Sequence, residues 1–215
     1  MAQLSWRPPS PTPSALMPPS YEIAQVPTET VVYMFSPQES NIMLLLPPAD
    51  SPDTRPRYHI SISFNMWNPL SFITTVRKGA TDSAPIVAEF DMGISTLPGT
   101  VSMGGITKFL KEVLIEREWT KFHWKFRQDA RQHIYWERTT NEPGLYHCFV
   151  NGIKLASYQG ATVKRRPKAS PLTVHPKGQP YFDDIVVSLL ILERRRFRPP
   201  APRSGGLLEQ NAWWS

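Results

Sequence analysis

Residues 182–198, FDDIVVSLLILERRRFR, combine an apolar run with charges of opposite sign at its two ends. Seven aliphatic residues fall between Ile185 and Leu192, and Ser188 is the single polar residue among them. A run this short fits a buried strand or a buried helix, and its β-branched residues favour the strand. The acidic pair before the run and the arginines after it favour a helix, because each charge then lies where the helix dipole stabilises it. We predict a helix over about residues 182–197.

A helix that is apolar on every side must be enclosed on every side. The preceding chain supplies an enclosing wall, because its apolar residues recur with the period of two that is typical of half-buried strands. The clearest examples are YHISISFNM (58–66), PIVAEFDM (85–92) and KFHWKFR (121–127). About ten such strands, separated by turn residues such as Asn151-Gly152, predict an antiparallel barrel or sandwich. We expect one short helical turn near residues 106–114.

The two ends of the chain differ from this pattern. Residues 1–30 contain seven prolines interleaved with Ser and Thr, which predicts a disordered Pro-rich tail. Residues 199–215 are interpreted as a second disordered tail, which carries the pair Trp213–Trp214. The ordered domain is therefore expected to span residues 31–198.

The segments YHISIS, PLSFITTVRKG, PIVAEFDMGIS, TVSMGG, KFHWKFR and GLYHCFVNGIKLASY, followed by the apolar run, resemble an uncharacterised domain family that is abundant in mushroom-forming fungi. In organisation, residues 31–198 resemble the tubby C-terminal-like superfamily, which includes the LURP-one-related proteins and the phospholipid scramblases. The resemblance implies a closed antiparallel β-barrel of about twelve strands wrapped around a C-terminal central helix, with a binding role. Tubby-type relatives bind phosphoinositide head groups, but no residue of this sequence matches their ligand-binding positions.

The sequence contains no recognisable catalytic constellation. His147 and Cys148 are adjacent in a predicted strand, so their side chains point to opposite faces and cannot form a nucleophile–base pair. Cys148 is expected to be a small buried residue. Asp183 and Asp184 are expected to serve the helix N-terminus, because neighbouring helical side chains diverge. The five histidines lack metal-ligand spacing, and phosphate-binding glycine motifs are absent. We therefore predict a non-enzymatic protein without catalytic residues, cofactor or metal.

The charges suggest a ligand. The chain has 24 Lys and Arg residues against 18 Asp and Glu residues, a net charge of +6. The candidate anion-binding residues form two basic runs: Lys164, Arg165, Arg166 and Lys168, and Arg194, Arg195, Arg196 and Arg198. Each exposed cation contributes about 1 kcal/mol toward binding an anionic membrane. In the alternative interpretation, the arginines only complement the helix dipole and the other run is merely solvated. Nucleic-acid binding is not expected, because the aromatic residues of KFHWKFR alternate with its cations and point inward.

The leading hypothesis is an intracellular barrel domain that binds anionic lipid or phosphoinositide head groups through these basic runs. An alternative is a protein-interaction or scaffold module that acts through the Pro-rich tail and Trp213–Trp214, and a third is an enzyme without a recognisable motif. No apolar run approaches the roughly 20 residues of a membrane span, and the N-terminus lacks the apolar segment of a secretory signal. With a single cysteine, the chain is expected to be a cytoplasmic monomer that associates peripherally with membranes.

Overall fold

The protein is described here by a computed structural model that covers residues 27–67, 71–94, 97–129, 133–160 and 170–196. The strands are β1 (Val31–Phe35), β2 (Ile42–Leu46), β3 (Tyr58–Phe64), β4 (Phe72–Lys78), β5 (Ile86–Asp91), β6 (Thr100–Met103), β7 (Ile106–Phe109), β8 (Leu114–Glu118), β9 (Lys121–Trp124), β10 (Ile134–Arg138), β11 (Leu145–Val150), β12 (Ile153–Gln159) and β13 (Ser170–Val174). The helices are α1 (Leu110–Val113), the 3₁₀ helix η3 (Pro176–Tyr181) and α2 (Phe182–Arg196).

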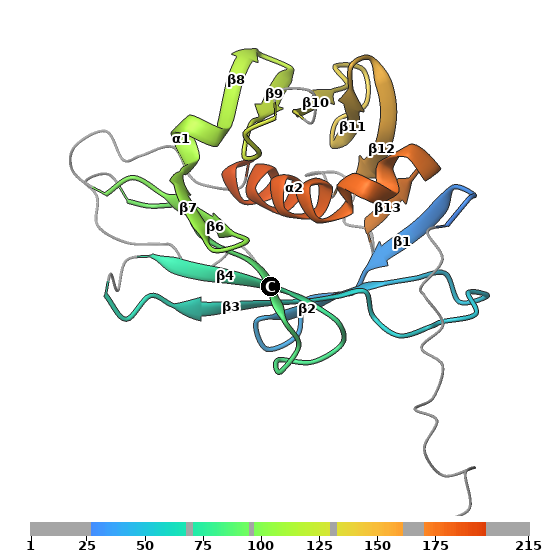
Figure 1. Ribbon diagram of the computed structural model, residues 1–215, viewed down its shortest axis with the longest axis horizontal. Helices are drawn as coiled ribbons and strands as arrows, with labels where there is room; N and C mark the ends of the chain where they lie inside the picture. The colour runs from blue at the N-terminus through green and yellow to red at the C-terminus, as the bar shows by residue number, and fades with distance from the viewer. Residues whose placement is uncertain (1–26, 68–70, 95–96, 130–132, 161–169, 197–215) are drawn as a thin grey trace, which may run out of the picture.

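All the strands form one antiparallel sheet, in the order β7-β6-β5-β4-β3-β2-β1-β13-β12-β11-β10-β9-β8. Strands β1 to β7 form one meander and β8 to β13 form another, since each strand pairs with its neighbours in sequence. The two meanders are joined by the ladder between β1 and β13, which runs from Val31↔Val174 to Phe35↔Ser170. They lie on opposite sides of α2, so the helix occupies the space between them (Figure 1).

The predicted mostly-β fold, an antiparallel sheet of about twelve strands with one C-terminal helix, is confirmed, but the structure does not show the closure of this sheet into a barrel. The sheet has thirteen strands, and no ladder joins its edge strands β7 and β8, all of whose residues are described. The physical reason is the connection between these two strands, because α1 takes the place of a hairpin turn and separates them. Next to the seam, Leu110 N donates to Gly99 O (2.9 Å) and extends the β6–β7 ladder, and Lys125 N donates to Val113 O (2.8 Å) and extends the β8–β9 ladder. Lys108 Nζ on β7 crosses the seam and donates to Phe126 O, just after β9 (2.6 Å).

The segment 106–114 differs from its prediction as a helical turn. Only Leu110–Val113 is helical, and strands lie on both sides of it. The turn before it explains the first of these strands, because Gly104 and Gly105 both have positive φ, +55° and +78°. Two consecutive left-handed residues make the tight hairpin turn that pairs Met103 with Ile106. Strand β13 was also not predicted, because its sequence contains Pro171, and proline usually argues against a paired strand.

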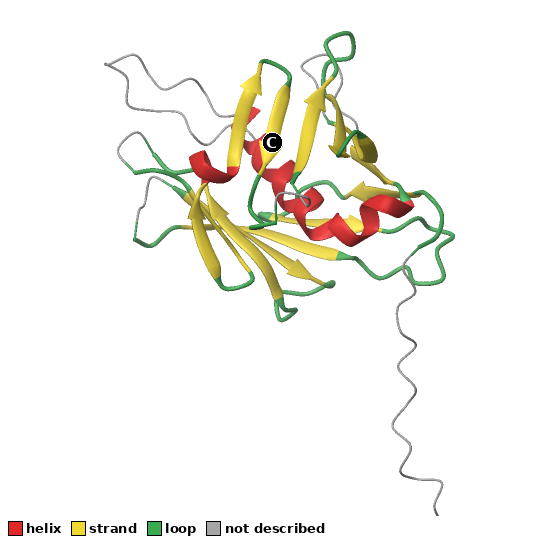
Figure 2. Cartoon of the chain, turned by 45° about the horizontal axis from the view of Figure 1, so that its top comes forward, coloured by secondary structure: helices red, strands yellow, loops and turns green. Residues whose placement is uncertain are grey.

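The predicted helix is confirmed and forms the centre of the core (Figure 2). Every residue from Ile185 to Leu192 is at most 8% exposed. The first residue of α2, Phe182, packs against two tyrosines of the sheet, Tyr33 and Tyr58, with ring centroids 4.6 and 5.2 Å apart. The strands therefore provide the apolar enclosure that a helix of this composition requires.

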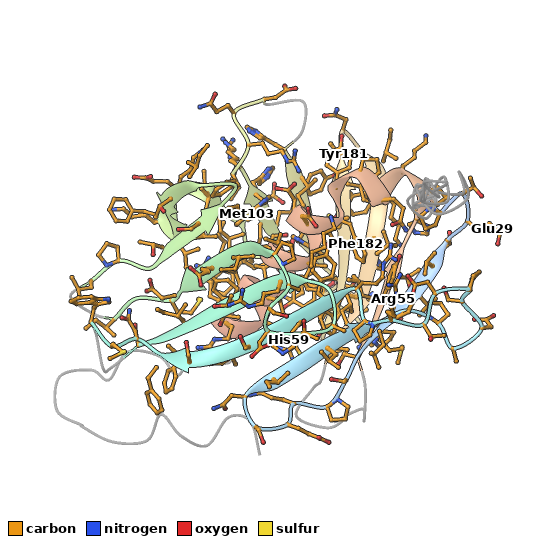
Figure 3. All side chains as sticks on the ribbon, turned by 60° about the horizontal axis from the view of Figure 1, so that its bottom comes forward. Glu29, Arg55, His59, Met103, Tyr181 and Phe182 are labelled. Carbon is orange, nitrogen blue, oxygen red and sulfur yellow. The ribbon has the colours of Figure 1, made fainter. Side chains whose placement is uncertain are left out.

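The period-two interpretation is confirmed for residues 121–127, but not at the end of 58–66, where Phe64 and Met66 are 68% and 92% exposed because this end of β3 extends beyond the core. Phe122, Trp124 and Phe126 are buried and face the core, whereas the residues between them are more exposed. His59 is an exception on the other face of the sheet. It alternates with the core residues Tyr58 and Ile60 and so points away from α2, yet it is buried by its neighbours (Figure 3).

Replacing a central residue of α2 tests whether the enclosed helix holds the fold together. Leu189→Ala should lower the free energy of unfolding by about 2–5 kcal/mol, because the enclosing strands cannot collapse into the space left by a fully buried side chain. The matched control is Ile153→Ala on β12, where the side chain is 42% exposed and the loss should stay below about 1 kcal/mol. Urea unfolding followed by circular dichroism measures both, and equal losses would contradict the central role of α2.

Candidate functional site

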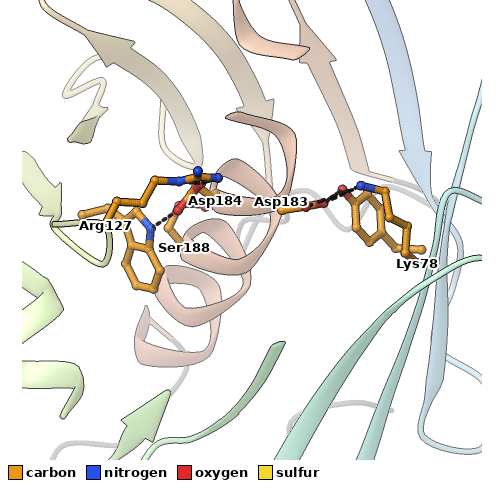
Figure 4. A network of polar contacts seen from close by, with 7 residues as sticks. Lys78, Arg127, Asp183, Asp184 and Ser188 are labelled. Atoms are coloured by element: carbon orange, nitrogen blue, oxygen red, sulfur yellow. Dashed lines mark hydrogen bonds and ion pairs between the residues drawn. The ribbon is translucent and has the colours of Figure 1, made fainter. Parts of the chain in front are cut away.

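The N-terminal end of α2 contains a buried carboxylate with two partners from the sheet (Figure 4). Asp184 accepts a hydrogen bond from Trp124 Nε1 (3.0 Å) and another from Arg127 Nε (2.7 Å). Arg127 Nη2 also lies 2.6 Å from the same carboxylate, which makes a two-point ion pair. The hydrogen bond to Asp184 raises the pKa of Arg127. These contacts fix the start of α2 to the end of β9.

The neighbouring carboxylate, Asp183, points to the other side of the helix (Figure 4). It accepts a hydrogen bond from the hydroxyl of Tyr58 (2.5 Å) and lies 3.3 Å from Lys78 Nζ. Burial, followed by the charge of Asp183, raises the pKa of Tyr58 well above its ordinary value. The two carboxylates diverge, as predicted, and so do not form a paired-carboxylate site. Their contacts with the sheet were not predicted.

The single polar residue of the apolar run, Ser188, also makes hydrogen bonds. Ser188 Oγ donates to the backbone oxygen of Asp184 (2.6 Å) and accepts a hydrogen bond from Trp136 Nε1 (2.8 Å). A buried indole N–H requires such a partner. Donors and acceptors at this end of α2 are thus matched with one another, and the cluster ties the helix to both meanders. We assign it a structural role.

The C-terminal end of α2 holds the arginines that the sequence singled out. Arg195 Nη2 donates to Glu116 Oε2 on β8 (2.8 Å), and Arg196 Nη1 donates to Glu193 Oε1 one turn earlier (3.0 Å). Arg194 is partly buried, and desolvation lowers its pKa. Neither acidic partner was predicted. Glu193 could have been found from its spacing of three residues along a helix, whereas Glu116 is 79 residues away from Arg195.

Glu193 is the more buried of the two acidic residues. Its side chain also lies near Tyr158, whose hydroxyl donates to Oε2 over 3.4 Å. Burial raises the pKa of Glu193, although Arg196 and Tyr158 act in the opposite direction. Arg196 therefore serves a structural purpose, because it balances a carboxylate that would otherwise be buried without a cation.

The other basic run and the last residue of this one cannot be placed, since they lie outside the described residues: Lys164, Arg165, Arg166 and Lys168, and Arg198.

The residue that precedes segment 161–169, Gly160, is part of the described structure. A methyl group added at Gly160 would lie 3.0 Å from Glu193 Oε2 and 3.1 Å from Arg196 Nη1. Gly160, the last described residue before the segment, therefore lies against the C-terminal end of α2.

The remaining candidates for reactive chemistry are the single cysteine and the side chains that bind metals. Cys148 is fully buried, as predicted, and burial raises the pKa of its thiol well above the ordinary value. Within the described ranges, no three His, Cys, Asp or Glu side chains are grouped so that they could hold a metal ion. The same residues include no helix with the length and apolar character needed to cross a lipid bilayer.

The fold defines a class of mostly-β protein in which one antiparallel sheet surrounds a C-terminal helix. A family model with the description "Family of unknown function (DUF6593)" matches residues 47–198. The chain belongs to this family. The match begins directly after β2, so β1 and β2 precede it although they are part of the same sheet. No curated protein and no solved structure matches the chain.

Two aspartate variants test the structural role of the N-terminal cluster. Asp184→Ala should lower the free energy of unfolding by about 3–5 kcal/mol, because it leaves Arg127 and Trp124 Nε1 without their partner. Asp183→Ala is the matched control and should cost only about 1 kcal/mol, since its carboxylate is one-third exposed and water can replace it. Thermal and urea unfolding distinguish the two, and a larger loss in the control would contradict this assignment.

The raised pKa of Glu193 predicts a pH dependence of stability. The folded state holds the Glu193 proton more tightly than the unfolded state, so this residue favours folding at pH values below about 4.5 and loses that contribution as the pH rises through its raised pKa. The wild type should therefore lose stability relative to Glu193→Gln as the pH increases from about 4.5. Urea unfolding of both proteins between pH 4 and pH 8 measures the difference, and a wild type that gains on the variant over this range would show the opposite sign.

Proposed function

We propose that the protein is a non-enzymatic domain that binds an anionic surface, specifically phosphate-bearing lipid head groups, at the C-terminal end of α2. The observation that carries this proposal is the contact of Gly160 with Glu193 and Arg196. It means that the segment with the first basic run begins beside the arginines of the second. Four residues of extended chain reach at most about 14 Å, and we propose on this ground that the first basic run contributes to the same surface as the arginines of α2.

The distribution of charge supports the same region. Eight of the 24 basic residues belong to the two runs, and two of the 18 acidic residues, Glu116 and Glu193, pair with them. Sixteen basic and sixteen acidic residues then remain in the rest of the chain. The excess of +6 is thus equal to the charge of this one group of residues. A positive field concentrated in this way steers an anionic partner toward one end of the molecule.

Two of the described arginines, Arg195 and Arg196, are proposed to have different roles. The ion pair of Arg195 with Glu116 is solvent-exposed, with side chains 47% and 40% exposed, and such pairs contribute only about 0–1 kcal/mol. A phosphate group can therefore compete with Glu116 for Arg195. Arg196 is mostly buried with Glu193, so we assign it to positioning. Arg195 is the described residue that we propose to contact the ligand directly.

The resemblance to the tubby C-terminal-like superfamily supports a phosphoinositide as the specific head group. A sheet of two meanders around a C-terminal helix is consistent with that superfamily, and we propose that this family is a member of it with an open seam in place of a closed barrel. The interaction-module alternative depends on the predicted tails, residues 1–30 and 199–215, of which the structure describes only residues 27–30. It stays a prediction.

Liposome flotation tests the proposal. Wild-type protein should float with vesicles that contain phosphatidylserine or a phosphoinositide, and less with neutral phosphatidylcholine vesicles. The double variant Arg165→Gln, Arg195→Gln should lose about 30-fold in partition coefficient, because each cation contributes about 1 kcal/mol. A control that removes the same charge at the two ends of β9, Lys121→Gln with Lys125→Gln just after the strand, should lose much less. Equal recovery with neutral and anionic vesicles would reject the proposal.

A further inference from the structure

The β3–β4 turn exposes large apolar side chains at one end of the sheet. Trp67 is 96% exposed, Met66 is 92% exposed and Phe64 is 68% exposed. The ring of Phe64 packs against that of Phe72 on the paired strand, with ring centroids 5.0 Å apart. Such side chains rarely gather on a surface in contact with water alone, and they mark sites of interaction.

The turn holds these residues in place by hydrogen bonds. Asn65 N donates to Ser71 O (3.1 Å), and Asn65 Nδ2 donates to Ser71 Oγ (3.1 Å). Asn65 Oδ1 accepts a hydrogen bond from Trp67 N (3.0 Å), which fixes the backbone direction from which Met66 and Trp67 project. The exposure of these two residues is therefore built into the local structure.

Sheet register brings further apolar residues to the same end. Ile73 pairs with Asp91, so the loop from β5 to β6 begins beside the β3–β4 turn, and it exposes Leu97. Thr100 pairs with Phe109, which places the exposed ring of Phe109 at this end too. We call Phe64, Met66, Trp67, Leu97 and Phe109 the apolar end.

Charge is excluded from the centre of this end. Residues 60–76 and 92–107 contain no Asp, Glu, Lys, Arg or His. Asp91 follows the first stretch in the sequence and lies at this end of the sheet. Its carboxylate accepts hydrogen bonds from Gly93 N (2.7 Å) and Thr100 Oγ1 (2.9 Å). At the border, Lys111 Nζ lies over the ring of Phe109, 5.6 Å from its centroid. An uncharged centre with a cationic border is complementary to a bilayer that has an apolar interior and anionic head groups.

The orientation of α2 connects this end with the basic residues. The start of β3 and the end of β4 contact the N-terminus of α2 through Asp183. From that contact, α2 and β3 run in the same general direction (Figures 1 and 4). The C-terminal end of α2 and the β3–β4 turn consequently lie on the same side of the molecule.

We infer that the apolar end inserts into the interfacial region of a lipid bilayer. The inference rests on the proposed function and deepens it: the basic runs bring the domain to an anionic surface, and Met66 and Trp67 then enter the layer between head groups and acyl chains. Tryptophan is favoured at that depth, since its ring is apolar and its N–H remains hydrated.

The chain offers a matched control for Trp67. Trp119 is 85% exposed and also lies in a hairpin turn, between β8 and β9. Its turn is bordered by the ion pair of Lys121 with Glu118 (3.2 Å), so insertion there would desolvate charges. Trp67→Ser should therefore weaken vesicle binding about tenfold, the effect of removing one large apolar side chain from an apolar environment. Trp119→Ser should leave binding unchanged.

A fluorescent label measures insertion directly. The native Cys148 is fully buried, so a thiol introduced by Met66→Cys or, as the control, by Trp119→Cys reacts selectively with an environment-sensitive dye. With vesicles of phosphatidylcholine and phosphatidylserine, the label at position 66 should shift to shorter wavelengths and be quenched by nitroxides on the lipid acyl chains. The label at position 119 should not change.

The outcomes separate this inference from the proposed function. Charge-dependent flotation with an unchanged label at position 66 would overturn insertion, leave head-group binding intact and assign the apolar end to a protein partner. A shifted label with equal binding to neutral and anionic vesicles would support insertion and overturn the charged site. Absence of binding to both kinds of vesicle would overturn both.

Discussion

The structure depends on the need to enclose a helix that has no polar side. Most surface helices bury one apolar stripe against a single sheet face, but α2 presents apolar side chains in every direction. One flat sheet would cover only part of it. The chain solves this with two meanders that meet at the β1–β13 ladder and lie on opposite sides of the helix. Polar groups that enter the core, such as Asp184 and Ser188, are tolerated because indole N–H groups and Arg127 pair with them.

Enclosure from two sides also explains why the sheet has a seam. The core needs walls around α2, but it does not need every neighbouring pair of strands to be hydrogen-bonded. At the seam, α1 covers the gap with Val113, and Lys108 crosses it to reach Phe126 O. Side-chain cover and this hydrogen bond thus take the place of a ladder at the seam. The open seam is a property of the connection between β7 and β8 and leaves the central helix enclosed.

The sequence predicted the features that depend on local pattern. The apolar run with charged ends identified α2, and alternation identified the inward faces of strands such as β9. Short strands without clear alternation, β7 and β8, were missed, as was β13 with its Pro171. At the candidate site, the arginines were found from their clustering. Their acidic partners were not, because Glu116 approaches Arg195 only after the second meander has folded.

The β1–β13 ladder has a consequence for how the chain reaches its native state. Val31 and Val174 are partners although 143 residues separate them in the chain, and α2 comes later still. Contacts between such distant residues carry a large loop-closure cost and slow the search for the native arrangement. During synthesis, the first meander leaves the ribosome before α2 does, so the apolar inner face of this meander stays exposed until α2 has also emerged. Newly made chains are therefore expected to rely on chaperones over that interval, and folding is expected to be a late, nearly all-or-none event.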